Sequence, residues 1–331
     1  MVTTVVCSIL ALFLVLLLVK INKVYKEIFK KSLSVNHAMV HYNYDVDYFH
    51  ESPDHYYADF TRSVMNKKHY VTEDGIFQLG GDSLESSVIN ICGVCEFALI
   101  NYDKFLQTKN QENLNHFKKN LEWLVDNAVP KNEMIFWYYD MDGPKPWASS
   151  ISQGMAISVL IRGYIYTKDV AYLNLAKRAF KTLSSSIHEG GFKYSYDHFD
   201  CWFEESSDNS HILNGHIYAL MGIYDLYRCT KDEDVLLIFN QGCNNIKTNI
   251  AYFDLSFIST YDAVERFPSN NSYHMIHIVL FEVLGEITKD IFFKTTATKW
   301  RKIYGSKKLR FYGFIYTFNL LINLKVTGKW K

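Results

Sequence analysis

Residues 212–246 read ILNGHIYALMGIYDLYRC-TKD-EDVLLIFNQGCNNI: an apolar run, a three-residue break and an amphipathic run. Apolar side chains recur at helical spacing on both sides of the break. Its aspartate, Asp232, is a natural helix N-cap, because a carboxylate can accept a hydrogen bond from the backbone of the first helical turn. The stretch therefore predicts two helices joined by a tight turn.

The same pattern occurs four times, about 60 residues apart. The four breaks are Thr108-Lys109-Asn110, Thr167-Lys168-Asp169, Thr230-Lys231-Asp232 and Thr288-Lys289-Asp290. Each follows a strongly apolar run and precedes a more amphipathic one, so the first helix of each pair would line the inside. The repeat predicts a mainly α-helical protein, an incomplete α/α toroid of about four helix pairs.

The rest of the chain divides around this repeat. Residues 1–31 combine an uncharged apolar run with a lysine-rich flank, which predicts a retained N-terminal transmembrane anchor helix. Residues 32–88 form a small β-rich section. Residues 89–305 hold the toroid, and residues 306–331 form a basic and aromatic tail. That tail is equally compatible with an interfacial membrane segment and with an extra helix on the toroid.

The lysines lie only on the C-terminal side of the anchor. The positive-inside rule then favours a single-pass membrane protein with a cytoplasmic body, and the Golgi lumen is the alternative in a eukaryote.

Composition narrows the function classes. Lys and Arg number 35, as do Asp and Glu, so no basic field suggests nucleic acid as a partner. Cys92 and Cys95 form a lone C-x-x-C inside an apolar helical run, which favours core residues over a metal site. The sequence has no glycine-rich nucleotide loop. We therefore expect no cofactor.

Long connections enter the N-termini of the inner helices, so their side chains gather at one mouth of the toroid. These connections are rich in aromatics, carboxylates and histidines, including Trp147, Tyr196, Trp202, Glu205, Tyr261, Tyr273 and His274. Helix N-termini at the same mouth favour an anionic ligand. Two plainer interpretations remain open: aromatics that only plug the toroid, and a solvated acidic helix cap at Glu204 and Glu205.

Several separated motifs resemble the D-glucuronyl C5-epimerase family, in its order and spacing, over roughly residues 70 to 303. They are Trp147-Ala148-Ser149-Ser150-Ile151-Ser152-Gln153-Gly154, Trp202-Phe203-Glu204-Glu205, Leu213-Asn214-Gly215, Thr260-Tyr261-Asp262 and Tyr273-His274. Members of that family, including the heparan sulfate and heparosan epimerases, convert D-glucuronate to L-iduronate within a polymer. The resemblance implies an isomerase with an α/α toroid and an acidic polysaccharide substrate; we leave a homodimer open as an assembly.

Inverting C5 requires one group to remove a proton and another to return one on the opposite ring face. By the resemblance, Glu205 and Tyr273 are the catalytic pair, and Tyr261 assists proton transfer or binds the intermediate. Expected substrate-binding residues are Trp147, Gln153, Tyr196, Trp202, Asn214, Arg266 and His274. For Gln153 and Asn214, helix capping or packing is an equally good account.

The chain departs from the family pattern at two positions. Ser206 stands where the family usually has tyrosine, and Val264 where it has arginine. Arg266 could replace that arginine, or else Lys193 or His198. These departures leave the reaction class standing but leave the exact uronan open, and they keep an inactive glycan-binding module as an alternative. Two further alternatives are a polysaccharide lyase acting on a uronan and a glycoside hydrolase with Glu205 and Asp262 as its carboxylate pair.

Overall fold

The computed structural model describes residues 40–43, 53–66, 69–139, 147–205, 209–304, 306, 308, 311–312 and 315–316. The expected anchor, residues 1–31, and most of the tail lie outside these residues. Within the described ranges, no helix has both the length and the apolar character that crossing a membrane requires.

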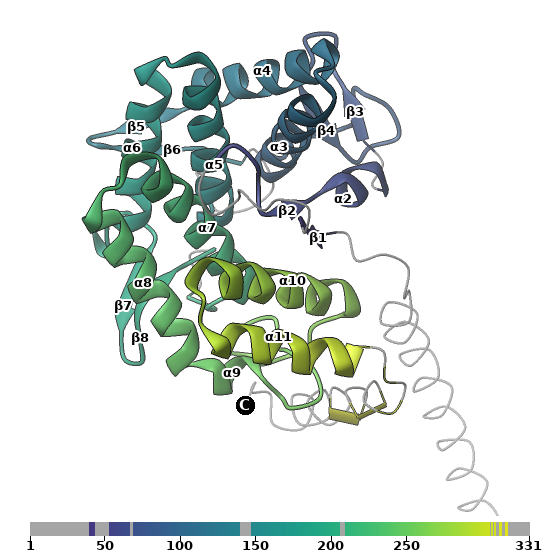
Figure 1. The fold of residues 1–331 in the computed structure, drawn as a ribbon, viewed down its shortest axis with the longest axis vertical. Coiled ribbons are helices and arrows are strands. Elements are labelled where there is room, and N and C mark those ends of the chain that lie inside the picture. Colours follow the sequence, from purple (N-terminus) through teal and green to yellow (C-terminus); the bar gives the residue numbers. More distant parts are fainter. Residues whose placement is uncertain are drawn as a thin grey trace, which may run out of the picture.

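Eight helices form four consecutive pairs. The pairs are α3 (Ile91–Thr108) with α4 (Gln111–Asp126), α5 (Ser150–Thr167) with α6 (Val170–Ser184), α7 (Leu213–Thr230) with α8 (Glu233–Thr248), and α10 (Asn271–Thr288) with α11 (Ile291–Tyr304). The pairs follow one another in an open arc, with a short helix α9 (Ile250–Phe253) after α8 (Figure 1). This arrangement confirms the predicted incomplete toroid of helix pairs.

The repeated break, Thr-Lys-Asn at its first occurrence and Thr-Lys-Asp at the other three, has one geometry at all four. In the first, the Thr108 hydroxyl donates to the carbonyl of Lys104 (2.7 Å) and accepts the N–H of Asn110 (3.2 Å). Lys109 adopts the left-handed conformation with φ 59°, and the Asn110 side chain caps α4 by accepting from Glu112 N. The lysines at the other three breaks have φ between 56° and 62°. Each break therefore ends one helix and starts the next through local bonds alone.

The inner helices pack closely enough for their backbones to touch. A Cβ built on Gly222 of α7 would lie 2.1 Å from the carbonyl oxygen of Gly154 on α5. Any side chain at Gly222 would force these two central helices apart.

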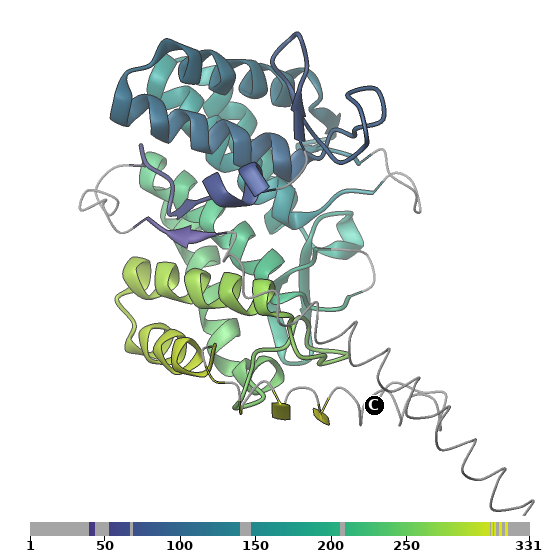
Figure 2. The same cartoon turned by 90° about the vertical axis from the view of Figure 1, so that its right-hand side faces the viewer.

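The strands form two-stranded antiparallel sheets beside the helices. They are β1 (His41–Tyr42) with β2 (Ala58–Asp59), β3 (His69–Val71) with β4 (Phe77–Leu79), β5 (Val129–Lys131) with β6 (Met134–Phe136), and β7 (Lys193–Tyr196) with β8 (Phe199–Phe203). A short helix α2 (Thr61–Asn66) follows β2, and a 3₁₀ turn η2 (Ile187–Glu189) precedes β7. In both views β1, β2 and α2 lie between α3 and α10, where the arc of helix pairs is open (Figures 1 and 2).

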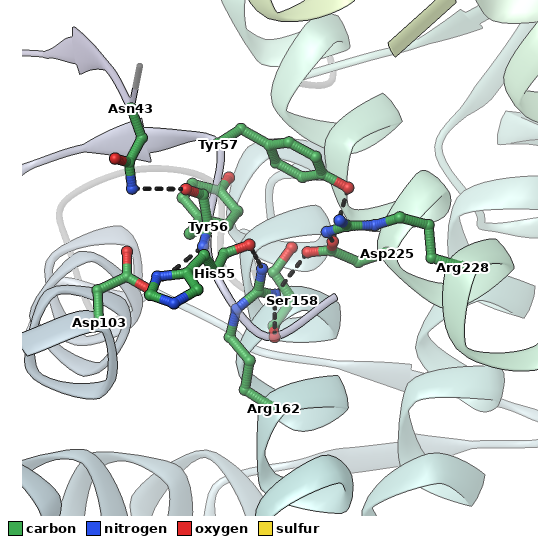
Figure 3. Close-up of polar contacts among 9 residues, drawn as sticks. All are labelled: Asn43, His55, Tyr56, Tyr57, Asp103, Ser158, Arg162, Asp225 and Arg228. Atoms are coloured by element: carbon green, nitrogen blue, oxygen red, sulfur yellow. Dashed lines mark hydrogen bonds and ion pairs between the residues drawn. The ribbon is translucent and has the colours of Figure 1, made fainter. Parts of the chain in front are cut away.

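The segment leading into β2 closes one end of the arc through a buried ionic cluster (Figure 3). Asp225 of α7 bonds Arg162 of α5 (2.6 Å) and Arg228 (2.5 Å), and all three side chains are buried. The Tyr57 hydroxyl donates to Asp225 (2.7 Å), and Arg162 donates to the carbonyl of His55 (2.8 Å). This closed end carries the C-terminal parts of the inner helices, so the opposite end carries their N-termini.

Candidate active site at the inner-helix N-termini

Glu205 lies at the N-terminus of α7, immediately beyond β8. A Cβ built on Gly215 would lie 2.4 Å from Glu205 Oε2, so the carboxylate fills the space that a side chain at 215 would occupy. Ile212, the N-cap residue of α7, makes no side-chain capping bond. The positive end of the helix dipole therefore favours negative charge at this position.

Tyr261 reaches the same place from a hairpin-like loop after α9. Its carbonyl accepts from Leu213 N (3.1 Å), the first residue of α7, and Ala263 N donates to Ser210 O (3.3 Å). Tyr273 lies in the first turn of α10, which Asn270 caps by accepting from Tyr273 N (3.0 Å). The segment before α7, the loop after α9 and the first turn of α10 therefore meet at one place.

Tyr261 and Tyr273 form a pair beside Glu205. Their ring centroids are 4.7 Å apart with the planes at 69°, and a hydrogen bond links the two side chains. Burial raises the pKa of both phenols, and the Glu205 carboxylate raises them further. The hydrogen bond from Tyr261 offsets part of the rise in the pKa of Tyr273. Both phenols are neutral at neutral pH, which suits them to donate protons.

Behind this pair, Ser259 connects the two segments that carry the tyrosines. Its hydroxyl lies 2.8 Å from His274 Nδ1 and 2.8 Å from His277 Nδ1, and its N–H donates to His274 Nδ1 (3.2 Å). Ser259 is two residues before Tyr261, and His274 directly follows Tyr273. The contact therefore joins the two segments that carry the tyrosines. Burial lowers the pKa of His274 to about 4 and that of His277 to about 3, so both rings are neutral.

The neighbouring Glu204 has a different role from Glu205. It is 2% exposed and pairs with His211 through both the backbone N–H and the imidazole Nδ1 of that residue. The interpretation of this carboxylate as a solvated cap is wrong, because its partner buries it.

Two of the expected substrate-binding aromatics reach the surface of this end. Tyr196 is 42% exposed and packs against Tyr194 and His188. Trp147 is half-buried, with its ring centroid 4.3 Å from that of Tyr139.

The structure does not bring four other expected binding residues to that surface. Trp202 is fully buried between the rings of His216 (4.0 Å) and Phe253 (5.2 Å). His274 is buried as described above, and Asn214 is buried at the start of α7. Gln153 is buried and donates to the carbonyl of Ile135 (2.6 Å), so it holds β6 against α5. These four buried side chains pack below the surface of the candidate site.

Arg266, expected to bind the uronate carboxylate, is held by backbone carbonyls. Its guanidinium donates to the carbonyls of Tyr252 (3.2 Å) and Ala251 (2.9 Å) and lies 5.9 Å from the Tyr252 ring centroid. Val264, at the other departure from the family pattern, is 59% exposed.

Cys92 is a site neighbour that the sequence interpretation missed. It lies in the first turn of α3, with its Sγ 3.1 Å from the Tyr139 hydroxyl, and it adds to the rise in the pKa of Tyr273. Its apolar neighbours in the sequence favoured a core residue. Its position at the start of an inner helix was the one feature that could have indicated a place near the site. Across the described residues, no group of three or more His, Cys, Asp or Glu side chains could hold a metal ion.

The chain belongs to the D-glucuronyl C5-epimerase family, since the family model of the D-glucuronyl C5-epimerase C-terminus matches residues 127–302. It is 26% identical over 223 residues to a D-glucuronyl C5-epimerase of Caenorhabditis elegans, covering 58% of this chain and 36% of that protein. It is 28% identical over 178 residues to an uncharacterized protein of Methanocaldococcus jannaschii, covering 51% of this chain and 58% of that protein. The chain thus matches only part of the length of each relative.

Two solved structures match part of the chain. A sugar epimerase from a ruminal bacterium gives a TM-score of 0.46 at 14% identity, covering 63% of this chain and 59% of the other. A family 76 α-mannanase of Bacteroides thetaiotaomicron gives 0.49 at 16% identity, covering 72% and 64%. Scores and identities at this level do not define a common activity.

Proposed function

We propose that this protein is a uronate C5-epimerase that converts D-glucuronate to L-iduronate within a heparosan-like acidic polysaccharide. The observation that carries the proposal is the convergence of one carboxylate, Glu205, with two neutral phenols, Tyr261 and Tyr273, at the inner-helix N-termini. Family membership supports the same reaction class.

The reaction moves two protons. Glu205, as a carboxylate, takes the C5 proton of D-glucuronate, and the electron pair delocalises into the sugar carboxylate as an enediolate-like intermediate. Tyr273, as a neutral phenol, donates a proton to the opposite face of C5, which yields L-iduronate. Tyr261 donates a hydrogen bond to Tyr273 and so stabilises the phenolate that remains. Return of a proton from Glu205 to Tyr273 through solvent resets the site.

The glycoside hydrolase alternative needs two available carboxylates. Asp262 is 6% exposed, and its Oδ1 accepts the backbone N–H groups of Val264 (2.9 Å) and Glu265 (2.6 Å). Because Asp262 is buried and bonded to this turn, it is a poor second carboxylate for glycoside hydrolysis with Glu205. A lyase remains the second candidate, because it starts with the same C5 proton and then expels the C4 substituent.

The test is incubation of heparosan with the full-length protein in deuterated water, followed by proton NMR. We expect deuterium at C5, iduronate signals and an intact chain. Vinylic signals with chain cleavage would replace the epimerase by a lyase. Absence of C5 exchange on heparosan and other uronans would overturn both.

A further inference from the structure

The C-terminal part of the chain carries a strong excess of positive charge. Residues 291–331 contain ten lysine and arginine residues and no aspartate or glutamate. The first 290 residues hold the other 25 basic residues and all 35 acidic ones. Charge of one sign that gathers in one segment indicates an anionic partner for that segment.

A groove lies along α11, the helix that opens this basic part. Its volume is about 660 Å³, and the side chains of Lys294, Lys299 and Lys302 line it together with the apolar Ile291. Lys302 is exposed, and Ile291 is 69% exposed. No acidic side chain is among the lining residues. The groove therefore presents amines and apolar surface at the same place.

Carboxylates of neighbouring segments already neutralise part of this charge. The three pairs are Lys294 with Glu286 (2.9 Å), Lys299 with Asp254 (2.5 Å) and Arg301 with Glu282 (2.7 Å). The net positive charge of the surface therefore comes mainly from Lys302 and from the tail, residues 306–331, where all six charged side chains are basic.

The described part of the tail presents an apolar face to solvent. Lys308, Phe311, Tyr312 and Ile315 follow one another at the spacing of a single helix face, and the backbone is helical at each of them. Phe311 is 52% exposed, Tyr312 46% and Ile315 39%, and Lys308 beside them is exposed as well. An apolar face with a basic flank is the pattern of a segment that lies in a membrane interface.

The tail and the groove are neighbours. Ser306 N donates to the carbonyl of Ile303 (2.9 Å), which lines the groove. Farther along, the Tyr316 ring packs 5.8 Å from that of Phe257, and the preceding Ser256 also lines the groove. In both views the coloured pieces of the tail lie beside α11 (Figures 1 and 2). The tail and the groove therefore form one continuous surface.

The exposed face separates the two interpretations of the tail. A helix that docks on the toroid buries its apolar face against it. In the described residues only Tyr316 turns towards the body, whereas the side chains of Phe311, Tyr312 and Ile315 point away from it. These contacts favour an interfacial segment over an extra helix.

We propose that the tail and the groove along α11 bind the surface of an anionic lipid bilayer. Phe311, Tyr312 and Ile315 enter the interface, and Lys302 and Lys308 lie at the level of the lipid phosphates and carboxylates. The proposal does not depend on the proposed function, because none of these residues belongs to the candidate active site.

The test is hydrogen–deuterium exchange of the full-length protein, read in the peptides that cover residues 306–316. The protein is mixed with vesicles of phosphatidylcholine alone, or of equal parts of phosphatidylcholine and phosphatidylserine. Because the signal comes from this segment only, an anchor at residues 1–31 adds nothing to it. We expect the phosphatidylserine vesicles to slow exchange about tenfold and molar salt to abolish the effect.

The variants separate the charged contribution from the apolar one. Each lysine near an anionic surface strengthens binding about fivefold, so Lys302→Gln with Lys308→Gln should reduce the slowing to less than about twofold. Phe311→Ser should reduce it to about threefold. Leu237→Ser is the matched control, since Leu237 of α8 is 54% exposed, as much as Phe311, and lies outside the surface. It should retain the full effect.

Three results would overturn the proposal. The first is unchanged exchange in the phosphatidylserine vesicles, and the second is equal slowing by both kinds of vesicle. The third is slow exchange of residues 306–316 without vesicles, because the body of the protein or a second copy would then cover the apolar face.

Discussion

The closed end, at the C-termini of the inner helices, and the opposite end at their N-termini, here called the open end, differ in how far a key carboxylate is buried. At the closed end Asp225 is surrounded by Arg162, Arg228 and the Tyr57 hydroxyl, and every group in this set is buried. At the open end Glu205 lies half-buried beside two phenols that a substrate can approach.

The difference lies in which segments cover each end. Residues 53–60 cover the closed end and supply backbone and hydroxyl partners to its charges. The open end is covered by loops that bury Glu204 and Asp262 but leave Glu205 half-buried. Burial acts to raise the pKa of Asp225, but the two arginines outweigh it and hold the pKa below its usual value. The closed end is thus a completed electrostatic unit, whereas at the open end Glu205 is half-buried beside two phenols.

The largest effect should follow from breaking the closed end. Asp225→Ala leaves two buried guanidinium groups without their carboxylate, which should lower the free energy of unfolding by about 3–5 kcal/mol. Urea unfolding measures the loss. Glu282→Ala is the control, since it removes a carboxylate from an ion pair with half-exposed Arg301 and should cost less than about 1 kcal/mol. Equal losses in the two variants would contradict the contrast between the ends.

Acid should lower the stability of the folded protein through His216, a buried histidine at the open end. Burial lowers the pKa of His216 to about 3, so this imidazole is neutral in the folded protein but titrates near pH 6.5 when unfolded. Its stabilising contribution is therefore complete above about pH 6.5 and decreases as the pH falls towards 3. At pH 5 the loss is about 2 kcal/mol for this imidazole.

The pH dependence of unfolding in His216→Gln isolates that contribution. Glutamine can still accept from Phe203 N and donate to Gly242 O, as the imidazole does, but it does not titrate. The variant should lose about 2 kcal/mol less than the wild type between pH 7 and pH 5. An unchanged pH slope would show that this histidine is not the responding group.

Removing one hydroxyl at the open end should lower the free energy of unfolding by a smaller amount. Ser259→Ala removes the hydroxyl between His274 and His277 and should cost about 1 kcal/mol in unfolding free energy. Because this contact joins the segments that carry Tyr261 and Tyr273, we expect kcat for C5 exchange to fall about tenfold with little change in KM.

Ser158→Ala is the control for that experiment. The Ser158 hydroxyl is buried without a hydrogen-bond partner among the described residues, so its removal should be nearly neutral. A Ser259→Ala enzyme with unaltered kcat would reduce Ser259 to a packing residue.

Local chemistry explains why so much of the helical fold could be predicted. Each Thr-Lys-Asp break makes its bonds within a few residues, so its sequence alone specifies the end of one helix and the start of the next. The closed end could not be predicted in this way. Its central pair joins Arg162 to Asp225, 63 positions apart, and its cover comes from residues 53–60.

The candidate site was predictable in kind but not in detail. The long connections into the inner helices predicted that Glu205, Tyr261 and Tyr273 lie at one mouth, and the structure brings these three side chains together. The sequence could not separate residues that face the site from those beneath it, as Trp202 and His274 show. Their burial depends on Phe253 and Ser259, which fold back from distant segments.

The most direct test of the account compares C5 exchange and thermal stability in Glu205→Gln. If the open end holds the reactive groups, exchange into heparosan should fall by about 10² to 10⁴, while the melting temperature stays near that of the wild type. Exchange at the wild-type rate would contradict the assignment of Glu205. So would a loss of exchange that only accompanies unfolding, because Glu205 would then be a second structural carboxylate like Asp225.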